Sequence, residues 1–104
     1  MSQINWKERA EHMNFNGQAF INGQRVDALS GATFECISPC DGRKLADVAR
    51  CDKADVDAAV SVAREAFEDG RWAHLSPRKR KEILIRFADL IVQSKNELAL
   101  TETL

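Results

Sequence analysis

The stretch PRKRKEILIRFADLIVQSKNELALTETL (Pro77–Leu104) decides the fold, because it has the pattern of one long amphipathic helix. Ser76 is a good N-cap residue, and Pro77 stands at the first helical position, where its missing N–H costs no hydrogen bond. Only Ser94 and Lys95 interrupt the apolar stripe. The residues that recur at helical spacing are Ile83, Leu84, Phe87, Ala88, Ile91, Leu98 and Ala99. The pattern therefore predicts a single helix over residues 77–104.

The length of this helix is large compared with the size of the chain. At about 1.5 Å per residue the helix is about 42 Å long. A compact chain of this length has a radius of gyration of only about 13 Å. Residues outside this sequence must therefore cover much of the apolar stripe, and we expect the chain to be the truncated opening section of a longer protein.

Composition is that of an ordinary soluble globular protein, with 44% hydrophobic and 30% charged residues. The net charge of −1 gives no general reason to bind nucleic acid or an anionic membrane. The N-terminus lacks the apolar segment of a signal peptide, and no apolar run approaches the roughly 18 residues of a membrane span. Three cysteines without a secretory signal are typical of free thiols in a reducing compartment. We expect a cytoplasmic protein that binds neither nucleic acid nor membrane.

The first half of the chain predicts an N-terminal arm over residues 1–17 and a small β-meander over residues 18–51. Within the arm, residues 6–12 form either a short helix or part of a mobile segment. Asn22-Gly23 supplies the two positive φ angles of a type I′ turn, so the flanking residues predict a hairpin. A second strand pair is predicted between residues 33–37 and residues 45–50.

The second half predicts a helix over residues 53–69 ahead of the helix over residues 77–104. Asp52 is a good N-cap, Asp55 suits the positive helix N-terminus, and Gly70 marks the end of the first helix. Strands followed by helices are typical of an α+β domain. Two or three short strands present too narrow a sheet to cover two long helices, which again indicates part of a larger fold.

The three cysteines and two histidines do not predict a metal site. Cys36, Cys40 and Cys51 lack the doubly paired spacing of structural zinc ligands, and His12 and His74 lie in different segments. Nothing in the sequence places a base beside a cysteine to activate it, so we expect Cys36 to pack inside the meander and the other two to lie in loops. No Gly-rich phosphate-binding motif is present, and we assign no catalytic and no cofactor-binding residue.

Two further features have both a functional and a structural interpretation. The basic run Arg78–Lys81 either contacts an anion or nucleic acid, or is a solvated helix face with Arg78 and Lys79 paired to Glu82. We favour the solvated face, because the net charge is near zero and no aromatic residues are interleaved. Trp72 either faces a ligand or fills the corner between the two helices, and we favour the corner.

A series of segments, taken in order, resembles the start of the NAD(P)-dependent aldehyde dehydrogenases over residues 18–104. These segments are FING (20–23), TF (33–34) with SP (38–39) and DG (41–42), LADVA (45–49), DVDAAV (55–60), AF (66–67) with Gly70 and Trp72, and ADLI (88–91) with ELA (97–99) and ETL (102–104). The resemblance implies an α/β parent fold with a Rossmann-type cofactor domain, of which this β-meander and two long helices are the opening part.

The resemblance also implies the reaction of the parent enzyme. In that family a cysteine thiolate attacks an aldehyde, hydride passes to NAD or NADP, and a glutamate-activated water releases the carboxylate. The family's catalytic and dinucleotide-contacting residues match no position here, so we expect the chain alone to bind no cofactor and to be inactive. Some members bind a monovalent cation through a backbone carbonyl that corresponds to Ile37, although Ser38 stands where Asn is common.

The implied partners are the remainder of the enzyme and further copies of it in a homo-oligomer. The arm with Trp6 and the run Ser76–Lys81 look most like enzymes that act on ω-amino aldehydes, such as gamma-glutamyl-aminobutyraldehyde dehydrogenases. An alternative function is a stand-alone interaction module, derived from such an enzyme, that binds a partner through its exposed apolar helix faces.

Overall fold

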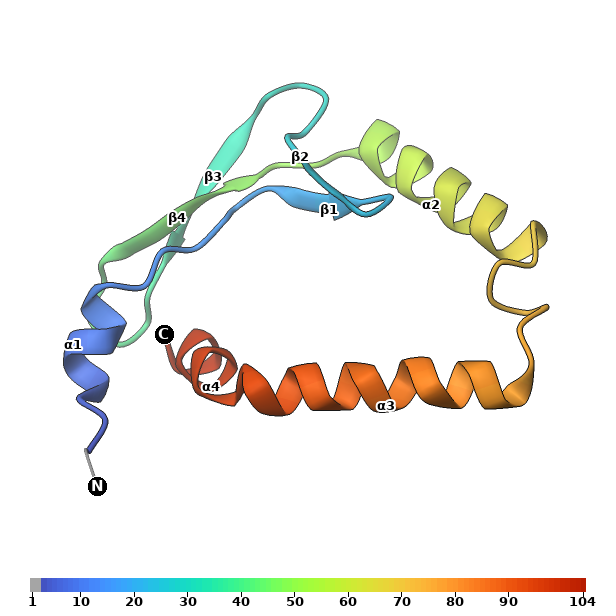
Figure 1. Ribbon diagram of the computed structural model, residues 1–104. Helices are drawn as coiled ribbons and strands as arrows, with labels where there is room; N and C mark the ends of the chain where they lie inside the picture. The colour runs from blue at the N-terminus through green and yellow to red at the C-terminus, as the bar shows by residue number, and fades with distance from the viewer. Residues whose placement is uncertain (1–2) are drawn as a thin grey trace.

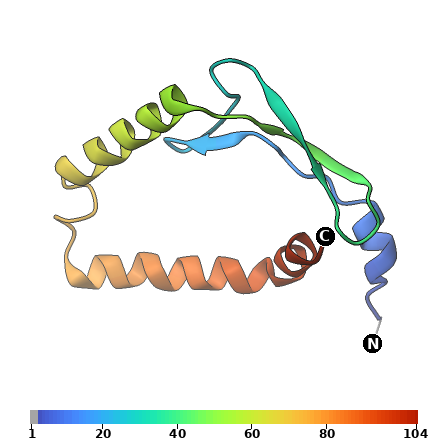
Figure 2. The same ribbon diagram turned by 180° about the vertical axis from the view of Figure 1, so that it is seen from behind.

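The computed structural model describes residues 3–104 as four helices and two strand pairs arranged around an open space (Figure 1). The strands and α2 lie along one side, and α3 returns along the other, an arrangement that the view from behind also shows (Figure 2). The Cα radius of gyration is 17.9 Å and the principal extents are 46 × 44 × 17 Å. A compact chain of this length has a radius of gyration of about 13 Å, so the molecule is flat and open.

The two predicted hairpins are present as two separate two-stranded sheets. Strand β1 (Ala19–Ile21) pairs antiparallel with β2 (Gln24–Val26), and β3 (Thr33–Ile37) pairs antiparallel with β4 (Lys44–Ala49). Asn22 and Gly23 have φ of 54° and 74°, which confirms the predicted two-residue turn. The hairpins join where the Ala49 N–H donates to the Gly17 carbonyl at 2.7 Å.

Helix α2 (Lys53–Glu68) begins where the sequence predicts and ends one residue before the predicted end at position 69. Asp52 and Asp55 form a capping box, in which each side chain accepts a hydrogen bond from backbone N–H groups at the helix start. At the other end, Asp69 is the C-cap and Gly70 takes φ of 76°, the left-handed conformation that terminates helices. A Cβ at Gly70 would also collide with the ring of His74.

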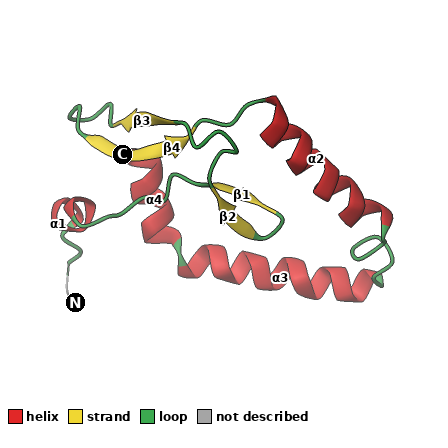
Figure 3. Cartoon of the chain, turned by 90° about the horizontal axis from the view of Figure 1, so that it is seen from above, coloured by secondary structure: helices red, strands yellow, loops and turns green. Residues whose placement is uncertain are grey.

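The single helix predicted over residues 77–104 is wrong, because the structure has two helices there. Helix α3 (Pro77–Gln93) ends at Ser94, and α4 (Lys95–Thr103) continues in a different direction (Figure 3). Ser94 has φ −101° and ψ 11°, outside the helical region, and its side chain makes no capping bond. The break falls at the two polar residues that interrupt the apolar stripe, where serine is a weak helix former and residues 81–95 are exposed, so no packing holds the backbone helical.

Helix α1 (Trp6–Glu11) confirms the helical alternative for the N-terminal arm. The Asn5 side chain caps it by accepting from the Glu8 N–H at 3.1 Å. The helix lies near the C-terminal end of α4 and the turn between β3 and β4, as both side views show (Figures 1 and 2).

Very little of the described chain is buried. Among residues 3–104 the buried apolar residues are Ala28 and Leu100, and the buried polar residues are Ser38 and Asp55. Trp72, expected to fill the corner between α2 and α3, is 43% exposed. None of the helices in residues 3–104 combines the length and the apolar character needed to cross a membrane.

Candidate functional site

The turn between β3 and β4, residues 38–43, follows the predicted cation ligand Ile37 and is held by several hydrogen bonds. Ser38 is 1% exposed, its N–H donates to the Arg43 carbonyl at 2.8 Å, and its carbonyl accepts from Gly42 N–H at 2.9 Å. Its hydroxyl oxygen accepts from the Cys40 N–H at 3.2 Å. The turn is therefore held by backbone hydrogen bonds and by the Ser38 hydroxyl, and the buried polar groups of Ser38 have partners within the turn.

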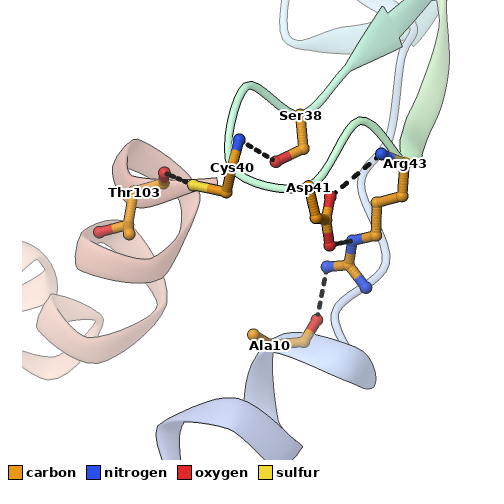
Figure 4. A network of polar contacts seen from close by, with 6 residues as sticks. All are labelled: Ala10, Ser38, Cys40, Asp41, Arg43 and Thr103. Atoms are coloured by element: carbon orange, nitrogen blue, oxygen red, sulfur yellow. Dashed lines mark hydrogen bonds and ion pairs between the residues drawn. The ribbon is translucent and has the colours of Figure 1, made fainter.

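This turn also contacts the C-terminal ends of two helices (Figure 4). The Arg43 guanidinium donates through Nη2 to the Ala10 carbonyl of α1 at 3.0 Å, and the Cys40 thiol donates to the Thr103 carbonyl of α4 at 3.3 Å. A cation is stabilising at the negative C-terminal end of a helix dipole. The Arg43 contact therefore favours the position of α1 beside this turn. The partners lie 33 and 63 positions apart, and the sequence carries no local signal for either contact.

The geometry does not assemble a metal centre from side chains. Within residues 3–104, no group of three or more His, Cys, Asp or Glu side chains gathers closely enough to hold a metal ion. His12 instead bonds through Nδ1 with the Glu8 carbonyl at 2.8 Å, and His74 packs against Gly70. The Ile37 carbonyl at the end of β3 stays a prediction that rests on the resemblance alone.

The cysteines are free thiols in the environments that the sequence predicts. Cys36 is half-buried on β3, and Cys40 and Cys51 are exposed in loops. Partial desolvation raises the pKa of the Cys51 thiol, and the negative charges of Asp55 and Asp52 raise it further. A raised pKa lowers the thiolate fraction, which is the opposite of what a nucleophile needs.

The helix N-termini do not fit the pyrophosphate of a dinucleotide. At α2 the Asp52 and Asp55 carboxylates already occupy the backbone donors, and their negative charge repels an anion. At α3 the Ser76 hydroxyl accepts from the Lys79 N–H at 3.2 Å. At both of these helix starts a side chain of the protein already accepts from the backbone N–H groups that a pyrophosphate would use.

The basic run Arg78–Lys81 has the partners expected of a solvated helix face. Arg78 and Lys79 each lie 3.7 Å from the Glu82 carboxylate, which confirms the predicted pairing. Arg80 donates to the Ala73 carbonyl at 3.4 Å. The Glu82 carboxylate partly offsets the positive charge of Arg78 and Lys79.

Many large apolar side chains on α2 and α3 are exposed to solvent. Every residue from position 81 to position 95 is exposed. The large apolar side chains of this surface are Val56, Val60 and Phe67 on α2 and Ile83, Leu84, Ile85, Phe87, Leu90, Ile91 and Val92 on α3, all between 41% and 68% exposed. Val60, Ala63 and Phe67 also line a shallow apolar depression along α2. The arrangement supports packing against another protein layer, and we call it the helix surface.

Asp55 is the residue whose role the sequence predicts only in part. Its Oδ2 completes the capping box, as expected, while Oδ1 accepts from the Leu29 N–H at 2.9 Å. The second bond ties the loop after β2 to the start of α2, across 26 positions. Asp55 is 4% exposed, and its two bonds hold the loop after β2 against the start of α2.

Comparison with known proteins is consistent across sequence and structure. The model of the aldehyde dehydrogenase family matches residues 26–104. The curated aldehyde dehydrogenase 1 of Tanacetum cinerariifolium is 46% identical over 100 residues, which are 96% of this chain and 20% of that protein.

Solved structures agree equally well. An indole-3-acetaldehyde dehydrogenase of P. syringae, in complex with NAD+ and IAA, superposes with a TM-score of 0.93 at 54% identity. A gamma-glutamyl-gamma-aminobutyraldehyde dehydrogenase from Burkholderia cenocepacia gives 0.93 at 51%. Each match covers 96% of this chain and 20% of the other, so the chain spans about a fifth of the length of its relatives. The chain belongs to the aldehyde dehydrogenase family.

Proposed function

We propose that these residues form the opening part of the cofactor-binding domain of an NAD(P)-dependent aldehyde dehydrogenase, which oxidises an aldehyde to a carboxylate. The observation that carries the proposal is the uncovered helix surface, together with the match to only the N-terminal portion of the relatives. In this function the helix surface packs against the remainder of the enzyme, which supplies the catalytic residues.

The amount of exposed surface indicates that a large area of this chain is buried against other residues in the parent enzyme. The chain exposes 8639 Å². A compact monomer of 11.7 kDa exposes about 5,900 Å² by the usual scaling of area with mass. The excess of about 2,700 Å² is roughly three times the 800 Å² or so that one partner buries in a standard interface. Such an excess favours a missing domain core over a transient docking partner.

The alternative of a stand-alone interaction module has no specific observation in its favour. A module that folds before it binds needs a core of its own. In residues 3–104 only Ala28 and Leu100 are buried apolar residues. The enzyme proposal explains the same helix surface without requiring the chain to fold by itself.

A graft tests the proposal directly. Residues 1–104 would replace the aligned segment of the P. syringae indole-3-acetaldehyde dehydrogenase, to give what we call the grafted enzyme. We expect it to fold and to reduce NAD+ with its aldehyde, measured by the absorbance of the reduced nicotinamide. A folded grafted enzyme of native size without activity would contradict the proposal.

Two neighbouring substitutions in α3 make the test specific to the helix surface. Phe87 is 59% exposed here, and we expect Phe87→Gln to destabilise the grafted enzyme by about 3 kcal/mol or more, as for other core aromatics. The matched control is Arg86→Gln, which introduces the same side chain next to it and should leave stability nearly unchanged. Equal stability of the two variants in urea unfolding would show that the helix surface is not buried.

We infer that the parent enzyme uses NAD or NADP bound by residues outside this chain. The NAD+ complex of the P. syringae relative supports the type of cofactor, and the occupied helix N-termini support its placement elsewhere. We further propose that the enzyme acts in the cytoplasm as a homo-oligomer. The free thiols are compatible with a reducing compartment, and the mass of the native enzyme in solution tests the assembly.

The substrate class that we propose is the ω-amino aldehydes. Support comes from the gamma-glutamyl-gamma-aminobutyraldehyde dehydrogenase at 51% identity and from an aminoacetaldehyde dehydrogenase of Pseudomonas aeruginosa at 42%. The enzyme purified from its source cells should show a higher kcat/KM for an ω-amino aldehyde than for indole-3-acetaldehyde. The reverse order would overturn this assignment.

The Ile37 carbonyl is proposed as one ligand of a monovalent cation in the parent enzyme. Its place at the end of β3, beside a turn held rigidly by Ser38, supports the assignment. Other oxygen ligands would have to come from outside the chain. The test is thermal unfolding of the parent enzyme. A midpoint that rises with K+ or Na+, and not with a bulky organic cation, would support the assignment.

A further inference from the structure

We draw no further inference here: the strongest candidate, the broad apolar face of α3 between Ile83 and Val92, belongs to the helix surface already described, and nothing in the structure shows which element covers it.

Discussion

At the scale of single residues, Asp55 is the most consequential side chain outside the helix surface. It accepts hydrogen bonds from Leu29 N–H and Asp52 N–H while 4% exposed, so removing it takes the partner from two part-buried backbone donors. We expect Asp55→Ala to destabilise the grafted enzyme by about 1–3 kcal/mol in urea unfolding. Asp57→Ala is the control, since Asp57 makes only an exposed pair with Lys53, and it should cost a small fraction of that. Equal losses would show that the Leu29 bond carries no stability.

The contact between Asp69 and Arg71 makes the stability of the fold depend on pH, in a direction that follows from the contact. The side-chain hydrogen bond from Arg71 holds the pKa of Asp69 below its usual value of 3.8. A carboxyl with a lowered pKa contributes stability above its unfolded pKa and loses it as pH falls through the folded pKa. We therefore expect Asp69→Asn to lower stability at neutral pH and to reduce the loss on acidification. Arg71→Ala should reproduce both effects. If both variants lose stability on acidification as the unmodified protein does, the contact does not stabilise the fold.

Sequence predicts residue roles here only where the signal is local. The caps Asp52 and Ser76 and the turn Asn22-Gly23 depend on neighbours within four positions, and all three are confirmed. The Arg43 bond to the Ala10 carbonyl is not predicted, because it depends on how distant segments meet in space. The same limit applies to the bond between Cys40 and Thr103.

At the scale of elements, the predicted order of hairpins and helices is confirmed, and the error lies within the last helix. The apolar stripe is interrupted only at Ser94 and Lys95 and resumes in the same register at Leu98, so the stripe alone predicts one helix. The periodic pattern reports which face is apolar and does not report whether the backbone at Ser94 stays helical. That depends on packing, which residues 3–104 do not supply at this position.

Ser76 and Ser94 provide a matched test of this break, because each precedes a helix and only one of them caps it. The Ser76 hydroxyl accepts from the Lys79 N–H, whereas Ser94 makes no side-chain capping bond. We expect Ser76→Ala to cost about 1 kcal/mol and Ser94→Ala to change stability by less than about 0.5 kcal/mol in the grafted enzyme. A larger loss for Ser94→Ala would mean that this hydroxyl gains a partner in the whole enzyme.

At the scale of the whole molecule, the sequence predicts the family and the need for outside cover, because both depend on the pattern of the chain as a whole. The apolar stripe of residues 77–104 is too long for a compact chain, and in the structure its side chains are exposed. The sequence does not predict the flat, open shape of the chain, since that shape depends on how distant elements are placed relative to one another (Figure 1).

The final prediction is that Phe87→Gln harms the grafted enzyme and improves the solubility of the isolated chain. In the grafted enzyme Phe87 is buried by our proposal, so Phe87→Gln removes packing and lowers stability. In the isolated 104-residue chain Phe87 is 59% exposed, so the same change removes an apolar side chain from solvent and should decrease dye binding and self-association. Light scattering and binding of a hydrophobic dye measure the second effect, and urea unfolding measures the first. Destabilisation of both proteins, with a sharp unfolding transition in the isolated chain, would instead indicate a core that forms within these residues and would favour the interaction module.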